Sequence, residues 1–294
     1  LGLTMACALC YLGLGMDAFD ATVHALTTVS TGGFANYDTS FGAFAGNTEY
    51  VASLFMVLAA LPFVRYVQLL NGHAEPLWRD SQIRVFVITL LVIVLVMTVA
   101  LAQLFPGSVE PSFRKALFNG TSIMTGTGYS SDDYMGWGAF LVSMFFFIGL
   151  IGGCAGSTTC SIKIFRYQLL FVSIRLQLRK IRSPNGVFVV RYQKRPVGDD
   201  VLSSVMSFFM FFILTMGLLA VALSLTGLDF ITALSGAATA LSNVGPGLGA
   251  EIGPAGNFGG LNDIAKWLLA IGMLLGRLEL LAVYAILTVQ FWKA

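Results

Sequence analysis

Three short loops rich in glycine and threonine recur along the chain, and their backbone could bind a cation. They read Ser30-Thr31-Gly32-Gly33-Phe34, Met124-Thr125-Gly126-Thr127-Gly128 and Asn243-Val244-Gly245-Pro246-Gly247. The third is the closest in spelling to the Thr-Val-Gly-Tyr-Gly filter of potassium channels, in which backbone carbonyl oxygens replace the water shell of the ion. Three such loops, each between a short helix and a long apolar segment, favour a cation pore over three unrelated turns.

Glycine suits a carbonyl-lined pore because it adopts positive φ angles without steric cost. We assign Gly32, Gly126 and Gly245 to the same position in the three loops and predict that they are the central ion-coordinating residues. The residues just before each glycine are predicted to supply the deeper carbonyl oxygens: Ser30 and Thr31, Met124 and Thr125, and Asn243 and Val244.

The composition is that of an all-α polytopic membrane protein. The chain is 56% hydrophobic and only 11% charged, with a mean hydropathy of +0.81, whereas about 25% of the residues of a soluble domain are charged. A membrane helix needs roughly 20 apolar residues. Such runs occur at Val85–Phe105, Phe140–Ile151, Val201–Leu225 and Ile264–Trp292, and at Tyr50–Leu70 with an interruption at Pro62.

An internal repeat organises these segments into an outer helix, a short re-entrant helix, a filter-like loop and an inner helix. We predict copies at residues 1–71, 81–182 and 199–294, with a basic cytoplasmic linker at 183–198. Leu1–Met16 is expected to be the stub of a truncated membrane helix and not a signal peptide, since it has no basic start.

The short helices are predicted to direct their C-terminal ends, which carry negative dipole, at the ion. They are expected at Phe19–Val29, Ser112–Ile123 and Asp229–Ser242.

The charge distribution predicts the topology. Lys163 to Arg195 holds nine Lys and Arg and no acidic residue, so this connection is expected in the cytoplasm. Most carboxylates then lie outside, where an acidic mouth would concentrate cations. Avoidance of Lys and Arg in outer loops would produce the same pattern.

A glycine-rich break interrupts the inner helix of the second copy at Gly152–Ser161. We predict that its small and hydroxyl residues form a gate below the filter: Gly152, Gly153, Gly156, Ser157, Thr158 and Thr159. The alternative is a kink that only adjusts helix packing. Lys163, just past the break, is grouped with the gate, although its long side chain could simply reach the inner membrane boundary.

Arg277 lies inside the apolar run Ile264–Trp292. A charge at the centre of a membrane helix costs about 2.5–3.5 kcal/mol on insertion scales, so such residues usually face a cavity or a partner. We predict that Arg277 contacts the glycine-rich break or forms a positive barrier beneath the filter. A purely structural pairing is the alternative.

These motifs resemble the Trk/Ktr/HKT superfamily of potassium transporters. Residues 25–34, 152–163 and 243–249 carry the resemblance, and Gly276-Arg277-Leu278-Glu279 is similar to the bacterial TrkH membrane subunits in particular. The resemblance implies four repeats around a pseudo-fourfold central ion pore, with one key glycine in each filter, a gating loop in the third repeat and an arginine near it. The present copies would be repeats two, three and four, without the first.

The resemblance further implies potassium uptake across the bacterial cytoplasmic membrane, with K⁺ as the transported ion and no organic cofactor. It implies a homodimer with a cytoplasmic nucleotide-binding regulatory subunit similar to TrkA, for which the basic segment is a plausible dock. Membrane lipid is an expected partner and nucleic acid is not, because inner-leaflet topology explains the basic charge.

Three other functions stay open at this stage. A Ktr/HKT-like transporter that depends on or conducts sodium would have a similar sequence. A secondary transporter would need paired broken helices, whereas only one inner helix is expected to be broken. An enzyme is least expected, since no nucleophile is paired with a base.

Overall fold

The chain forms a helical protein in the computed structural model, which describes all residues except 106, 108, 185, 187, 194, 279, 290, 293 and 294. Lys194 of the basic segment, Glu279 of the closing motif and the last residue of the predicted fourth repeat therefore lie outside the described residues. The boundaries of the repeats remain predictions.

Each of the three loops follows a short helix and precedes an apolar one, as the repeat predicts. The first group of elements comprises α1 (Gly2–Gly13), α2 (Ala18–Val29), a 3₁₀ turn (Ser40–Phe44), α3 (Asn47–Ala59), α4 (Phe63–Leu70) and α5 (Glu75–Arg79). The second comprises α6 (Ser81–Leu104), α7 (Val109–Thr125), a 3₁₀ turn (Tyr134–Trp137), α8 (Ala139–Gly149) and α9 (Ile164–Arg182). The third comprises α10 (Asp199–Leu225), α11 (Phe230–Ser242), a 3₁₀ turn (Phe258–Gly260), α12 (Asp263–Arg277) and α13 (Leu280–Leu287). A short antiparallel hairpin, β1 (Arg191–Tyr192) and β2 (Arg195–Pro196), joins the second group to the third.

Aspartates begin two of the three short helices. The carboxylate of Asp17 accepts a hydrogen bond from the Asp20 amide at 2.7 Å, and that of Asp229 accepts from the amides of Ile231 and Thr232. A side chain that caps the free amides at a helix start stabilises the helix by about 1 kcal/mol. The start of each of these helices is therefore set locally.

Among the described residues, two helices, α6 and α10, are long and apolar enough to cross a membrane. Two bent pairs bring the number to four if each pair is one span. The chain bends by 89° between α3 and α4, at the short break that contains Pro62. It bends by 102° between α12 and α13. The expectation of one broken inner helix is therefore wrong, because all three inner segments change direction. The apolar run Ile264–Trp292 is likewise not one helix, and Arg277 lies at the end of α12 and not in its middle.

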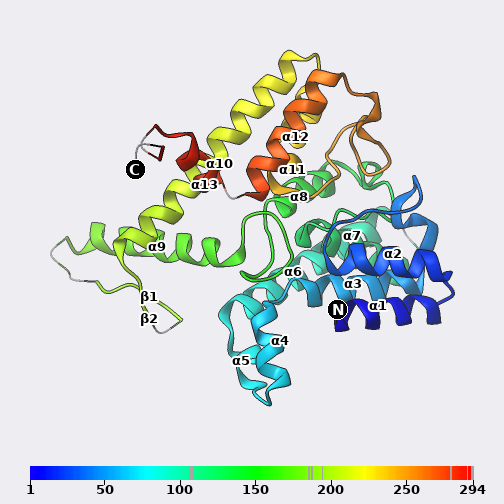
Figure 1. Cartoon of the computed structure of the whole chain (residues 1–294), viewed down its shortest axis with the longest axis horizontal. Coiled ribbons are helices and arrows are strands. Elements are labelled where there is room, and N and C mark those ends of the chain that lie inside the picture. Colours follow the sequence, from blue (N-terminus) through cyan, green and yellow to red (C-terminus); the bar gives the residue numbers. More distant parts are fainter. Residues whose placement is uncertain are drawn as a thin grey trace.

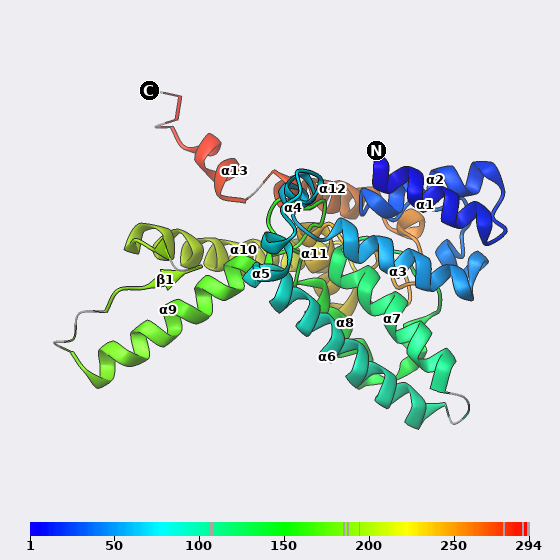
Figure 2. The ribbon, with the colours of Figure 1, turned by 90° about the horizontal axis from the view of Figure 1, so that it is seen from below.

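Figure 1 shows the three groups arranged around a central region where the loops meet, while α9 and the α4–α5 pair extend away from it. Figure 2, turned by 90°, shows α6 and α9 diverging below this centre. Each group has its own apolar core, exemplified by Phe55 among α1–α3, Phe86 between α6 and its neighbours, and Leu269 among α10–α12. Each core also takes in residues of a neighbouring group, such as Tyr129 in the first core and Val244 in the second, so the groups are joined through their cores.

An ion pair joins the first two groups. Arg114 on α7 donates to the carboxylate of Glu49 on α3 and, at 3.0 Å, to Glu110. The side chain of Glu49 is only 1% exposed, and it also accepts from the Gly46 amide at 2.9 Å. Loss of the arginine would leave a buried carboxylate without its counter-charge.

Replacement of this arginine, Arg114→Met, is expected to destabilise the protein by about 3 kcal/mol, because breaking a buried pair leaves a charge uncompensated. Thermal unfolding in detergent measures the effect. The double variant Glu49→Gln/Arg114→Met should recover part of the loss. Lys266→Met, at an exposed pair with Asp263 3.6 Å away, should change stability by less than about 1 kcal/mol. Equal losses at the two sites would contradict this prediction.

Candidate functional site: three loops and the strand of chain beneath them

The three loops share one backbone conformation. In each, an amide bonds to the carbonyl five residues earlier: Gly32 to Thr27 at 2.8 Å, Thr127 to Ser122 at 2.9 Å and Val244 to Thr239 at 3.2 Å. The residue before each of these amides has a positive φ, at Thr31, Gly126 and Asn243, and so does the residue after it, at Gly33, Gly128 and Gly245. These angles and bonds align the loops residue by residue.

This alignment corrects the register predicted from the sequence. Gly32 matches Thr127 and Val244, while Gly126 matches Thr31 and Asn243. The glycines that share a position are Gly33, Gly128 and Gly245. Met124 and Thr125 belong to the last turn of α7. This predicted pair therefore lies one residue closer to its helix than Ser30 and Thr31 do, and two residues closer than the pair from the third loop. Two closely spaced glycines in each of the first two loops made the register ambiguous in the sequence.

The matched glycines lie where neighbouring loops nearly touch. A Cβ atom at Gly33 would lie 1.8 Å from the Thr127 carbonyl oxygen, and one at Gly128 would lie 2.0 Å from that of Val244. The carbonyls of Thr127 and Val244, in the second and third loops, therefore each pack against the aligned glycine of the loop before. At Gly245 the nearest atom to such a Cβ is 3.9 Å away, so this side of the third loop is open.

We call the short helix before each loop, α2, α7 or α11, a pore helix. Each has a hydroxyl residue at the same position, five residues before the loop amide that bonds back to the helix. Thr27 donates to the Phe34 carbonyl at 2.9 Å, Ser122 donates to that of Tyr129 at 2.7 Å, and Thr239 accepts from the Gly245 amide at 3.0 Å. These side chains hold each loop against its own helix. Sequence reasoning missed them, although hydroxyl residues recurring at one distance from the loops were a readable signal.

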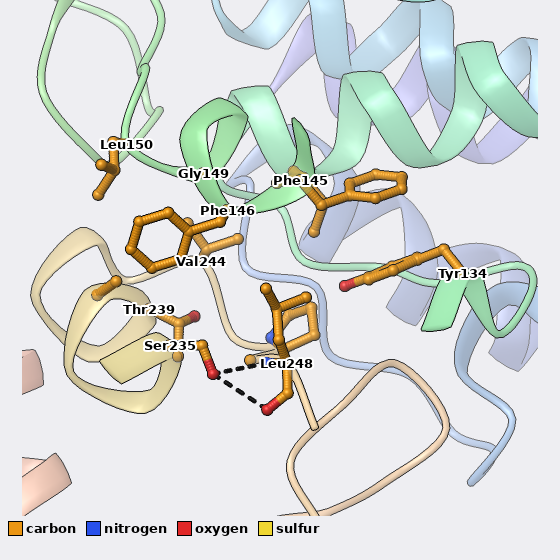
Figure 3. A pocket seen from close by; sticks show the side chains of 13 residues that line it. Tyr134, Phe145, Phe146, Gly149, Leu150, Ser235, Thr239, Val244 and Leu248 are labelled. Atoms are coloured by element: carbon orange, nitrogen blue, oxygen red, sulfur yellow. Dashed lines mark hydrogen bonds between the residues drawn. The ribbon is translucent and has the colours of Figure 1, made fainter. Parts of the chain in front are cut away.

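The third loop has a further support, visible in Figure 3. The Ser235 hydroxyl accepts from the Leu248 amide at 2.9 Å and donates to its carbonyl at 3.0 Å. Phe146 and Val244 line the small cavity, about 30 Å³, that lies between this loop and α8. The wall behind the loop is thus apolar and nearly filled.

The predicted gate is a compact loop between α8 and α9. Its neck is closed by a parallel bridge between Ile151 and Ile162, with the Gly152 amide donating to the Ile162 carbonyl at 2.8 Å. Gly153 lies within this neck, where its amide donates to the Thr159 hydroxyl at 3.1 Å. Gly156 has a φ of +76° and its carbonyl accepts from the Phe63 amide at 2.9 Å.

This loop lies at the C-terminal ends of all three pore helices and hydrogen-bonds to those of α2 and α11. Thr158 donates its hydroxyl to the carbonyls of Val29 and Ala59 at 3.1 and 3.2 Å, and its own carbonyl accepts from the Thr31 hydroxyl at 3.0 Å. The Ser161 amide donates to the carbonyl of Ser242, the last residue of α11, at 2.9 Å. A Cβ at Gly126, just after α7, would lie 3.1 Å from the Cys160 side chain.

Both predicted cations face this loop. The Lys163 ammonium donates to the Thr159 carbonyl and, at 3.1 Å, to its hydroxyl, so it folds back over the loop instead of extending to the membrane boundary. Arg277 donates to the Cys160 sulfur at 2.8 Å. The two line a cavity of about 250 Å³ with Ser157, Thr158, Thr159 and Asn243. The structure thus brings together the predicted gate residues and Arg277.

Carboxylates at the opposite, outer side have mostly structural roles. Glu49 and Asp132 pair with Arg114 and Lys115, and Asp17 and Asp229 cap helices. Asp20 accepts from Asn36 at 2.7 Å and from Tyr37 at 2.8 Å, and these hydrogen bonds lower the pKa of its carboxyl group. Attraction of cations by an acidic mouth is therefore weaker support for a pore than the loops are.

Within the described part of the chain, no three His, Cys, Asp or Glu side chains gather as a metal site. The polar groups available to an ion at the centre are therefore the backbone carbonyls and hydroxyls of the loops. This donor set suits a weakly hydrated monovalent cation, which carbonyl rings bind without trapping.

The aligned register predicts which glycines tolerate a methyl group. Gly33→Ala and Gly128→Ala should each destabilise the protein by about 2 kcal/mol or more, because overpacking and a strained φ add. Gly32→Ala is the matched control, since its Cβ would meet only the flexible Ser30 hydroxyl at 3.2 Å and a neighbouring ring at 3.4 Å. Thermal unfolding of the three variants tests this prediction. A larger loss of stability in Gly32→Ala than in Gly33→Ala would refute the alignment.

Comparison with known proteins agrees with this architecture. The family model of TrkH, described as a cation transport protein, matches residues 1–291. The Trk system potassium uptake protein TrkI of Halomonas elongata is 49% identical over 99% of this chain and 60% of its own length, and TrkH of Escherichia coli K12 is 33% identical over the same shares. The crystal structure of the potassium transporter TrkH from Vibrio parahaemolyticus superposes with a TM-score of 0.92 at 32% identity, covering 99% of this chain and 62% of that one.

The chain spans about 60% of the length of the relatives it matches. The match to the family model nevertheless extends over nearly all of its residues, and the fold agrees with the solved structure over the same extent. The chain is a multi-pass membrane protein and belongs to the TrkH family of cation transport proteins.

Proposed function

We propose that the protein takes up K⁺ across the cytoplasmic membrane through a filter built from the three loops and a fourth of the same kind. The observation that carries the proposal is the close stacking of successive loops, with the carbonyls of Thr127 and Val244 against Gly33 and Gly128. The open side of Gly245 is where the fourth loop would pack. The names of the relatives, Trk system potassium uptake proteins, indicate the same ion.

The direction of transport follows from the membrane potential. An inside-negative potential favours entry of one positive charge by roughly 2.3 kcal/mol per 100 mV. No chemical step by the protein is required for uptake. We propose that three aligned residues in each loop contact the ion. They are Thr31, Gly32 and Gly33 in the first loop, Gly126, Thr127 and Gly128 in the second, and Asn243, Val244 and Gly245 in the third. Ser30 and Thr125 directly precede the first two sets.

The loop at 152–161 is proposed as the gate, with Arg277 as the charge that holds it. The loop hydrogen-bonds to the ends of α2 and α11 and packs against Gly126 just after α7, which favours a position on the route of an ion that leaves the filter. Withdrawal of the loop would break the bonds of Thr158 and Ser161 and move the Cys160–Arg277 contact. The gate therefore has defined bonds to release.

Partners are proposed from charge. The exposed arginines of α9 and the linker, Arg175, Arg179, Arg182, Arg191 and Arg195, offer a positive surface for a cytoplasmic nucleotide-binding regulatory subunit. Because α9 directly continues the gate loop, a force applied there would reach the gate. We also propose a homodimer in the lipid bilayer.

Selective flux tests the filter. The full-length protein in liposomes should pass K⁺ faster than Na⁺. Gly245→Ser should lower that ratio about tenfold, since a side chain at a φ of +112° strains the loop and would occupy the space proposed for the fourth loop. Gly217→Ser on α10, exposed and with no atom within 4 Å, is the control. Equal K⁺ and Na⁺ flux through the wild type would favour the sodium-permeable alternative, and coupled substrate flux would favour a secondary transporter.

Thr158→Val tests the gate. The variant keeps the side-chain shape but loses the bonds to Val29 and Ala59, so flux through the resting protein should rise about fivefold, the effect of one buried hydrogen bond. Thr226→Val, which removes a 2.7 Å bond at the far end of α10, should leave resting flux unchanged. Resting flux that stays at the wild-type level in Thr158→Val would exclude Thr158 as a latch.

A further inference from the structure

Tyr129 leaves its own group of helices and enters the core of the neighbouring group. It directly follows Gly128, yet its ring is fully buried in the core that α1–α3 form with the adjoining 3₁₀ turn. Its centroid lies 5.1 Å from that of Phe41 in this turn and 6.5 Å from that of Phe118 on α7. The end of the second filter loop is thereby anchored behind α2, the pore helix of the first loop. Packing alone would explain such a ring if its hydroxyl made no hydrogen bond.

The hydroxyl of Tyr129 is instead the centre of a chain of hydrogen bonds. Tyr11 on α1 bonds to the Thr28 hydroxyl at 2.9 Å, and Thr28 donates to the Tyr129 hydroxyl at 3.4 Å. The Tyr129 hydroxyl bonds to that of Thr27 at 2.5 Å, and Thr27 donates to the Phe34 carbonyl at 2.9 Å. With Tyr11 and Tyr129 as donors in their links, each hydroxyl donates once, and the chain ends on the backbone of the first filter loop. The Tyr129 hydroxyl also lies 3.2 Å from the His24 carbonyl on α2, a second acceptor on the same pore helix.

Thr27 also contacts the first loop through its backbone. The Thr27 carbonyl accepts from the Gly32 amide at 2.8 Å, and Gly33 packs against the Thr127 carbonyl. Thr27 therefore holds both ends of the first loop, while Tyr129 holds Thr27 from the second loop. Buried chains of this kind polarise one another and hold a single geometry when every member is satisfied.

The other two loops have no such brace. The residues aligned with Tyr129 are Phe34, whose side chain is 75% exposed, and Pro246. Neither carries a hydroxyl. Among the described residues, the contact between the first and second loops is therefore braced by a side chain at this aligned position. Ser130, one residue further on, donates to the carbonyl of Pro254 at 2.9 Å, eight residues beyond Pro246.

We propose that Tyr129 is a positioning residue for ion selectivity, whose hydroxyl fixes the spacing between the first and second filter loops. The inference rests on the proposed function, since it concerns the same filter. Discrimination between K⁺ and Na⁺ depends on how the coordinating carbonyls are held around the ion. A loosened spacing would let the carbonyls close around the smaller ion.

Tyr129→Phe in the full-length protein, measured as K⁺ and Na⁺ flux into liposomes, tests the inference. The ring and its packing remain, so K⁺ flux and thermal stability should stay near wild type while the K⁺/Na⁺ ratio falls about fivefold, the size expected for one buried hydrogen bond. Tyr134→Phe is the matched control: it removes the hydroxyl of an equally buried ring, 4.0 Å from Phe145 and outside this chain of bonds, and should keep the ratio.

Variants of Thr27 separate positioning from folding. Thr27→Ser keeps the hydroxyl and should keep the ratio, whereas Thr27→Val should lower it. Tyr129→Phe/Thr27→Val should lose no more than Thr27→Val alone, because Tyr129 acts through Thr27. Wild-type selectivity in Tyr129→Phe, or a fall that is additive with Thr27→Val, overturns the inference. If Tyr129→Phe fails to fold, Thr27→Val against Thr27→Ser decides alone. A wild type without K⁺ preference overturns the proposed function itself, which distinguishes the two failures.

Discussion

Backbone groups that leave a helix at membrane depth must find partners within the protein, and this requirement shapes the whole centre of the structure. The last carbonyls of each pore helix have no partner in their own helix. In this chain the carbonyls of Val29 and Ser242, at the ends of α2 and α11, are bonded by the loop between α8 and α9, as is that of Ala59 at the end of α3. The proposed gate is therefore also a cap for two of the three helices that hold the filter. Its withdrawal requires water or an ion to replace it.

Close approach of neighbouring loops is the second constraint. Carbonyl oxygens of one loop occupy the space in which a side chain of the next would lie, at Gly33 and Gly128. Hydroxyl groups behind the loops then hold a backbone that has no regular secondary structure. The aligned positions of Thr27, Ser122 and Thr239 repeat this support three times, so the geometry is a property of the repeat and not of one loop.

Charge is distributed differently above and below the loops. On the outer side, carboxylates are mostly engaged as caps and in ion pairs, so the favourable potential for a cation comes chiefly from the carbonyls and the ends of the pore helices. On the inner side, Lys163 and Arg277 face the cavity next to the proposed gate. A cation passing the filter would meet these positive charges while the loop is in place. Displacement of the loop thus has an electrostatic as well as a steric consequence.

The sequence alone determined the membrane class, the three pore helices, the loops that follow them and the glycine-rich break, because each has a local signal in hydropathy, capping residues or glycine content. It did not determine the register of Gly33 and Gly128, the bend after α12 that places Arg277 at a helix end, or the insertion of Tyr129 into a neighbouring core. These depend on φ angles and on contacts between segments up to about a hundred residues apart. Local residue preference carries no information about such contacts, so only the packed repeats decide them.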